Sequence, residues 1–221
     1  MSDEIGGGWA RPAHQHRSRD QRDRLLRAGM QVFAQKGFWQ THVVDIAKAA
    51  GCSVGSFYRR FEDKESLFFA LQEFMHQRAH ENIRAFFDDP ARADETFTEM
   101  FERLMSNTLR AVRGISGYYR ALYEMSLRGY PVWPRMRELE AYQGRRIAKL
   151  AAARGATMPP AELALSAQLV TRMVNGQIIS VVLHGPGPYE ADDPRFVQEL
   201  ARICVGHLGL EKLPPKRQGA D

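Results

Sequence analysis

The sequence has few of the residues and runs that mark several classes of protein. Its 221 residues include two cysteines, Cys52 and Cys204, which lie far apart and form no CxxC pair. Two thiols at this spacing predict neither a disulfide scaffold nor a metal site, and they favour a reducing compartment. The longest apolar run, residues 178–183, falls far short of the roughly 20 residues that a membrane-spanning helix needs. Residues 1–8 hold two acids and no basic-then-apolar run, which is unlike a secretion signal. We therefore expect a cytoplasmic protein without a membrane partner.

What the chain does contain is typical of a packed globular protein. Hydrophobic residues make up 44% of it and charged residues 26%, a balance that excludes a wholly disordered or collagen-like chain. The net charge of +5 is unevenly distributed. Residues 1–64 hold 11 basic and 7 acidic residues, whereas residues 65–221 hold 20 and 19. A polyanion should therefore meet the N-terminal part of the chain.

The hydrophobic pattern predicts an all-α fold of about nine helices. No stretch alternates with a period of two for long enough to be a strand, while apolar residues recur at helical spacing between Gly, Pro, Ser and Asp signals. The first long helix starts at Asp20 and stops at Gly37, and Thr41 is a candidate N-cap for the next. The later helices are predicted over residues 54–61, 64–87, 94–113, 116–127, 131–154, 159–184 and 194–208.

These elements divide the chain into four parts. Residues 1–18 are rich in Gly, His and Arg without a period, which predicts a flexible arm. Residues 19–64 form an N-terminal head of three helices, and residues 65–210 a larger helical domain. Residues 211–221 are predicted to be a disordered tail. Arg17 at the end of the arm and Arg19 just after it would be free to reach a DNA minor groove, although a plain basic arm is an equal alternative.

Residues 41–67 have the helix lengths and turn spacing of a helix-turn-helix motif. Two short helices are joined by a tight turn at residues 50–52, and Ser53 caps the second helix. On that second helix Ser56 and Arg59 would reach base edges, and Tyr58 and Arg60 would reach bases or phosphates. The alternative is that two short helices with a glycine turn belong to an ordinary bundle. The local positive charge favours DNA, because neutralising phosphates supplies most non-specific affinity.

The same residues resemble the DNA-binding signature of TetR-family transcriptional regulators. The resemblance covers residues 20–68 and rests on three segments in the same order and spacing. These are VDIAKAAG at 44–51, SVGSFYRRF at 53–61 and DKESL at 63–67, preceded by a first helix with Ala28, Val32, Phe33 and Lys36 to Phe38.

The resemblance implies a role for each matching residue. Thr41, Tyr58 and Lys64 would contact phosphates, as short hydroxyls and helix starts do well. Ser53, Val54 and Ser56 would lie at the groove-facing start of the recognition helix. Val54 departs from the lysine frequent in the family, and Arg59 and Arg60 replace a frequent His-Tyr pair. Arg59 would therefore read guanine and Val54 a thymine methyl, so an operator sequence does not transfer from relatives.

For the helical domain, the resemblance implies a small-molecule pocket and a homodimer interface on the last two long helices. Aromatic and thioether groups gathered on the middle helices suit an apolar pocket with a few polar anchors, although each one alone is more simply a core residue. Arg172 and Asn175 lie in an otherwise apolar helix, where they would orient a ligand or serve a subunit contact. The candidate pocket residues are Phe86, Phe101, Met105, Tyr119, Tyr123, Trp133, Met136, Arg172 and Asn175.

The helix over residues 161–184 carries more apolar surface than one face needs, which predicts burial on two sides. Together with the last helix it would form a four-helix contact between two subunits, so that two recognition helices read a palindrome. The candidate interface residues are Leu169, Met173, Ile178, Val182, Phe196, Leu200, Ile203 and Cys204.

We predict no metal, cofactor or catalytic site. His76 and His80 stand four residues apart, but no third ligand is near in sequence, so a solvated helix face is favoured.

Taken together, these features predict a regulator, most simply a repressor released from a palindromic operator by a small apolar or aromatic molecule. An all-α enzyme and a non-specific architectural DNA-binding protein are the alternatives. No Ser-His-Asp order, P-loop or dinucleotide glycine motif supports the enzyme.

Overall fold

The computed structural model describes residues 11–185 and 187–213, with residues 11–19 described by their backbone alone. Within these ranges the chain is helical and contains no strand, which confirms the predicted all-α fold. The helices are α1 (Arg11–Lys36), α2 (Val43–Ala49), α3 (Val54–Tyr58), α4 (Lys64–Asp88), α5 (Phe97–Gly114), α6 (Ser116–Leu127), α7 (Trp133–Ala153), α8 (Pro160–His184) and α9 (Pro194–Leu208), with a short 3₁₀ turn η1 (Pro90–Arg92).

Local capping explains most of these boundaries. The Asp63 side chain accepts from the backbone N–H of Ser66 at the start of α4 at 2.6 Å, and Asp193 does the same for Arg195 in α9 at 2.9 Å. Where the prediction of α5 placed its start at residue 94, the structure starts it at Phe97. The reason is that Pro90–Arg92 form η1, and that Thr96 with Glu99 makes the capping box of α5.

The largest difference lies at the start of the chain. The first helix was predicted from Asp20 and the flexible arm over residues 1–18, whereas α1 begins at Arg11. The Gly-, His- and Arg-rich segment carries no apolar period, so the amphipathic pattern could not reveal these first turns. The predictions for residues 1–10 and 214–221, and for the side chains of Arg17 and Arg19, fall outside the described residues.

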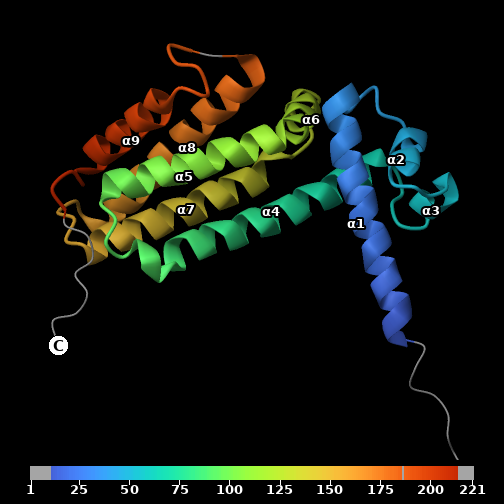
Figure 1. Ribbon diagram of the computed structural model, residues 1–221, viewed down its shortest axis with the longest axis horizontal. Helices are drawn as coiled ribbons and strands as arrows, with labels where there is room; N and C mark the ends of the chain where they lie inside the picture. Colours follow the sequence, from blue (N-terminus) through green and yellow to red (C-terminus); the bar gives the residue numbers. More distant parts are fainter. Residues whose placement is uncertain (1–10, 186, 214–221) are drawn as a thin grey trace, which may run out of the picture.

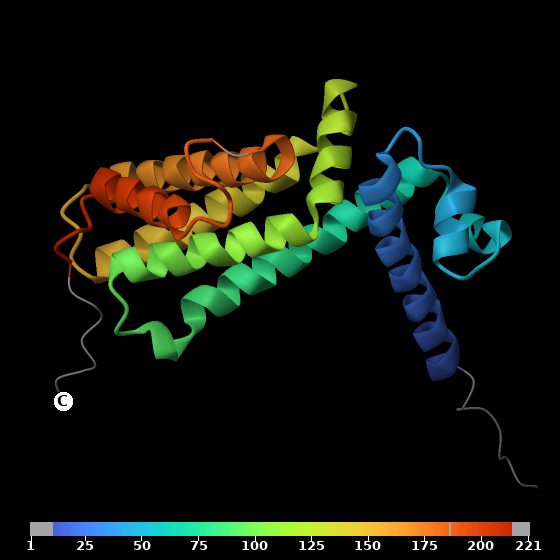
Figure 2. The ribbon, with the colours of Figure 1, turned by 45° about the horizontal axis from the view of Figure 1, so that its top comes forward.

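The helices form two bodies joined by α4 (Figure 1). α1, α2 and α3 stand at one end; at the other, α7 packs against α4, and α5, α8 and α9 complete the body, with α8 packed on α7 and α5, and α9 packed on α5 and α8. α6 crosses between the two bodies and lies beside α1, which both views agree on (Figure 2).

Each body has its own hydrophobic cluster. The head cluster joins Phe33, Phe38 and Phe57 to the first turns of α4, but it also includes Leu122 and Met125 from α6. The domain cluster is built by α5, α7, α8 and α9. The sequence placed the boundary between head and domain at residues 64 and 65. In the structure α6, fifty residues further along, completes the core of the head.

The two cysteines lie in these two different environments. Cys52 is half-buried at the turn of the head, and Cys204 is buried in α9. Burial raises the pKa of the Cys204 thiol to about 12. No helix among the described residues is long and apolar enough to cross a membrane.

Candidate functional site

The turn between α2 and α3 is built by backbone hydrogen bonds and one left-handed glycine. The amides of Ala50, Gly51 and Cys52 donate to carbonyls of α2, and Gly51 has a φ of +65°. Ser53 then caps α3, because its Oγ accepts from the backbone N–H of Ser56 at 3.2 Å. Phe57 is fully buried and packs against Phe61, with ring centroids 5.7 Å apart. One side of α3 is thus anchored, and the other is left for contact with a partner.

The exposed side of α3 carries four of the predicted DNA-binding residues. Tyr58 is 56% exposed and Val54 38%, and Ser53 and Arg59 are exposed as well. An arginine, a phenol and a small apolar group on a helix of this kind match what base edges, phosphates and thymine methyls require. The geometry therefore fits insertion of α3 into a groove.

Ser56 and Arg60, two further predicted contacts, are committed to bonds within the head. Ser56 is buried, and its Oγ accepts from Nη2 of Arg59 at 2.5 Å. Nη2 of Arg60 donates to Oε1 of Gln21 at 3.3 Å, which ties the end of α3 to α1. Arg59 keeps further guanidinium donors for a base, since the group carries five N–H bonds.

Thr41 and Lys64, also predicted to contact phosphates, make bonds within the head. Thr41 is fully buried, and its hydroxyl donates to the carbonyl of Gly37 at 2.6 Å, so its single proton does not point to a phosphate. The N-cap of α2 is His42 instead. Nζ of Lys64 donates to the carbonyls of Phe38, Trp39 and Thr41 at 3.0, 3.3 and 3.1 Å. These three bonds use all three ammonium protons, so Lys64 fastens the α1–α2 loop to α4.

A second contact set joins this loop to α6. Oε2 of Glu124 accepts from the backbone N–H of Phe38 at 2.8 Å, and the guanidinium of Arg128 lies over the Trp39 ring at 4.0 Å. Gly117 brings α6 so close to α1 that a Cβ at this position would stand 2.1 Å from Cα of Ala34. The head and α6 are therefore in contact through backbone atoms as well as side chains.

A cavity of about 870 Å³ lies between α4, α5, α6, α7 and α8, and α1 reaches it through Arg27 and Met30. Its size falls within the range of small-molecule sites. Of the predicted pocket residues, Phe86, Tyr119, Met136 and Asn175 line it. Burial raises the pKa of Tyr119 to about 12, so this phenol stays neutral at physiological pH.

The other predicted pocket residues do not line this cavity. Phe101 and Met105 are buried in the domain cluster, and Arg172 is exposed on α8. Tyr123 packs against Trp133 with ring centroids 5.1 Å apart, and Nε1 of Trp133 donates to Oγ of Ser126 at 2.5 Å. These side chains were grouped by residue type alone, and the packing of the helices separates them.

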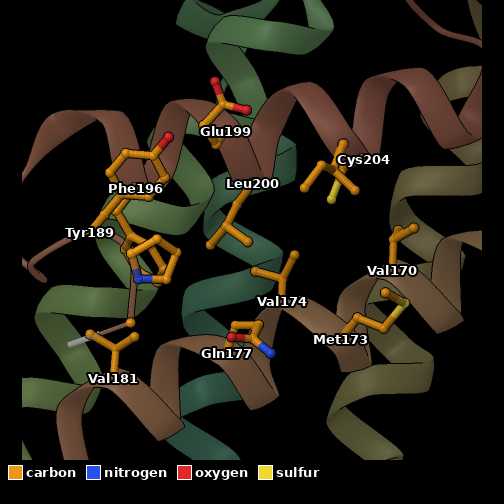
Figure 3. A pocket seen from close by; sticks show the side chains of 13 residues that line it. Val170, Met173, Val174, Gln177, Val181, Tyr189, Phe196, Glu199, Leu200 and Cys204 are labelled. Atoms are coloured by element: carbon orange, nitrogen blue, oxygen red, sulfur yellow. The ribbon is translucent and has the colours of Figure 1, made fainter. Parts of the chain in front are cut away.

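The predicted dimer residues differ in their exposure to solvent. Met173 and Ile203 are 55% and 52% exposed, and Leu169 is exposed as well. They belong to an apolar face of α8 and α9, hollowed by a groove of about 340 Å³ into which Met173, Leu200 and Cys204 project (Figure 3). Val182 and Leu200 are half-buried. In contrast Ile178, Phe196 and Cys204 are buried in the domain cluster, although Phe196 and Cys204 also form part of the wall of the groove.

The two histidines of α4 have separate partners. Nε2 of His76 lies 3.4 Å from Oε2 of Glu138, and the ring of His80 stacks on Tyr142 with centroids 3.9 Å apart. Both side chains are half-buried, so the helix face on which they lie is only partly exposed to solvent. The described part of the chain contains no group of three His, Cys, Asp or Glu side chains that would hold a metal ion.

Sequence reasoning missed Val44 of α2 and Arg27 of α1. Val44 is 58% exposed in the first turn of α2, and a large apolar side chain exposed on a short helix is the signal that could have found it. No sequence pattern places Arg27 at a site, and only the packing of α1 over the cavity brings it there.

Comparisons with known proteins agree with this architecture. Residues 25–71 match the profile of "Bacterial regulatory proteins, tetR family", and residues 96–208 match that of "Tetracyclin repressor-like, C-terminal domain". The uncharacterized HTH-type transcriptional regulator YerO of Bacillus subtilis (strain 168) is 34% identical over 55 residues, which are 25% of this chain and 19% of YerO. The matched regions span less than a third of the length of the curated relatives.

Two solved structures share the fold over most of the chain. A tetR-family transcriptional regulator from Streptomyces coelicolor superposes with a TM-score of 0.64 at 19% identity, covering 87% of this chain and 82% of that one. The regulator FadR from Bacillus subtilis, solved in complex with stearoyl-CoA, has a TM-score of 0.65 at 16% identity and covers 84% and 98%.

Proposed function

This chain belongs to the TetR family of bacterial regulatory proteins and is a DNA-binding transcriptional regulator, and on that premise we propose that it is a homodimeric repressor whose palindromic operator is released when a small molecule fills the cavity of about 870 Å³. The observation that carries the proposal is the surface of α3. Val54, Tyr58 and Arg59 are exposed on a capped helix whose opposite side is locked to the head by Phe57. Such a surface has the residues for reading bases, which is what separates a regulator from a non-specific binder.

The exposed apolar face of α8 and α9 supports the homodimer. Leu165, Leu169, Met173 and Ile203 are all at least half exposed on these two helices, and an apolar patch of this kind marks a protein contact. A two-fold axis through this face would pair α8 and α9 with their copies. The two α3 helices would then read half-sites one helical turn apart, about 34–36 Å.

Two features support the release by a ligand. The cavity is lined mostly by apolar and aromatic groups, and FadR of similar fold was solved with stearoyl-CoA, which has a long apolar chain. The lining also includes Arg27 and Met30 of α1, while α4 runs from the head along the same cavity. An occupant would tilt α4 and shift α1, and so change the separation of the two heads. Ligand and operator must then weaken each other by the same factor.

Selection of genomic fragments with purified protein, followed by footprinting, tests the proposal. We expect a protected palindrome. Arg59→Ala should lower its affinity by about 1–3 kcal/mol and relax base preference, and Tyr58→Phe should have a smaller effect, because each removes a direct contact. The matched control is Arg145→Ala, an exposed arginine on α7 far from the head in sequence. Uniform weak binding to all fragments would refute the proposal in favour of a non-specific binder.

A further inference from the structure

The cavity between α1, α4 and α5 has a marked gradient of polarity. Its buried lining is mostly apolar or aromatic and includes Phe86, Leu104, Val112 and Tyr118, while the buried Gln72 donates to the carbonyl of Val132. Its exposed lining is mostly polar and includes Arg27, Arg78, Asn107 and Arg110. A molecule that fills such a site needs an apolar body and one polar end.

The charge at this site is positive. Five arginines and one histidine line the cavity, against a single acid, Asp89. That carboxylate is already engaged, since it caps η1 and accepts from Nε of Arg92 at 3.1 Å. Arg135 is neutralised by Glu73 and Glu138 at 2.9 and 2.8 Å. The lining therefore carries a surplus of positive charge that its own acid does not balance.

Three of the arginines have no acidic partner. Within the described ranges no carboxylate lies within 4.0 Å of the guanidinium of Arg27, Arg78 or Arg110. Arg110 stands in the last turns of α5, which leads into α6 beside α1, the helix of Arg27 (Figure 2). Unpaired guanidinium groups of this kind bind carboxylates and phosphates in a bidentate fashion.

The aromatic part of the cavity also contains one buried donor. Nη1 of Arg92, another lining residue, is buried without a hydrogen-bond partner, and its guanidinium lies over the Phe86 ring at 4.2 Å. A buried N–H without an acceptor is unfavourable, and an acceptor atom on a bound molecule would satisfy it.

We infer that the ligand of this cavity is an amphipathic anion, with an apolar body among the buried aromatic residues and an acidic group at Arg27, Arg78 and Arg110. The inference rests on the proposed ligand-responsive function and specifies its ligand class. Because Arg27 belongs to α1, the anion bridges the head to α4 and α5. The charge of the ligand, and not its apolar body alone, then holds α1 in the bound position.

The test uses the full-length protein and three probes with the same tail: dodecanoate, dodecanol and dodecyltrimethylammonium. Isothermal titration calorimetry below their micelle concentrations measures each dissociation constant. We expect dodecanoate to bind at least about tenfold more tightly than the other two, because only it pairs with the arginines. The double variant Arg78→Gln/Arg110→Gln should weaken dodecanoate by roughly threefold to tenfold and leave dodecanol unchanged. Arg84→Gln is the control, an exposed arginine on α4 that does not line the cavity.

Three results would overturn the inference: equal or tighter binding of dodecanol or of the cation, an unchanged dodecanoate affinity in the double variant, or binding of none of the three probes. Operator release measured with the same probes separates this inference from the proposed function. If dodecanol or the cation binds best and releases DNA, the result supports ligand-responsive release and refutes the inference that the ligand is an anion. If dodecanoate binds as expected and operator affinity does not change, the result supports an anionic ligand and refutes the proposed release of the operator.

Discussion

The head and the helical domain present their functional residues in opposite ways. In the head, neighbours in sequence act together: Val54, Tyr58 and Arg59 share one exposed face of α3. In the helical domain the cavity is assembled from six helices that are distant in sequence, and its lining is concave. A convex site on one short helix leaves a local sequence pattern, whereas a concave site between many helices leaves none. The two regions nevertheless share a core, because α6 contributes Leu122 and Met125 to the head cluster.

The largest expected effect is on the stability of the head when α6 is removed. A chain of residues 1–89 keeps the head and α4 but lacks five of the 17 buried residues of the head cluster, Tyr118, Ala121, Leu122, Met125 and Val132, so apolar surface around Phe68 becomes exposed to water. We expect no cooperative thermal transition by circular dichroism, in contrast to the full chain. A sharp transition in residues 1–89 would mean that the head is independent, as the boundary at residue 64 implied.

The contact between α6 and α1 permits a sharper comparison. Gly117→Ala places a Cβ 2.1 Å from Cα of Ala34, and Gly144→Ala places one 2.7 Å from Cα of Gln168, within the helical domain. Each should lower the free energy of unfolding by about 3 kcal/mol, measured in urea, because a helix must shift. Gly117→Ala alone should also change operator affinity. Equal DNA binding by the two variants would contradict a role for the α6–α1 contact in coupling.

A substitution of Lys64 tests whether a positive charge in the head stabilises the fold or contacts a DNA phosphate. Lys64→Met removes the donors to three carbonyls, so we expect stability to fall by about 2 kcal/mol. The slope of log affinity for DNA against log salt concentration should stay unchanged, because no phosphate contact is lost. A lysine that neutralises a phosphate would instead reduce that slope by about 0.9. Arg59→Ala is measured beside it as the variant in which a DNA contact is expected to be lost.

The smallest effect concerns Asp45 on α2. Oδ1 of Asp45 accepts from Nζ of Lys36 at 2.7 Å, and this bond holds the pKa of the carboxyl below its usual value of 3.8. The stabilisation from this lowered pKa is fully present above pH 3.8 and is lost as the pH falls through the lower native pKa. Asp45→Asn should therefore unfold slightly earlier in urea at pH 7, and the difference should shrink as the solution is made acidic. A difference that grows in acid would contradict this assignment.

Features of the structure that depend on residues adjacent in sequence could be predicted, and features that depend on residues distant in sequence could not. Helix ends that depend on one cap, such as those at Ser53 and Asp63, were predicted correctly because cap and helix are adjacent. The roles of Lys64 and Arg27 could not be predicted. The first depends on carbonyls of a loop more than twenty residues earlier, and the second on α1 lying over the cavity. Tyr123 and Trp133 were misplaced for the same reason, since composition does not determine which side of a helix faces a cavity.

The two cysteines give the molecule a natural reporter. Thiol reagents attack the thiolate, and the Cys204 thiol is buried with a pKa of about 12, whereas Cys52 is only half-buried at the turn before α3. A nitroxide reagent at neutral pH should therefore modify Cys52 alone, without any substitution. In a homodimer this places one spin on each recognition unit, so a pulsed electron resonance measurement would read the distance between them directly, with and without a bound effector.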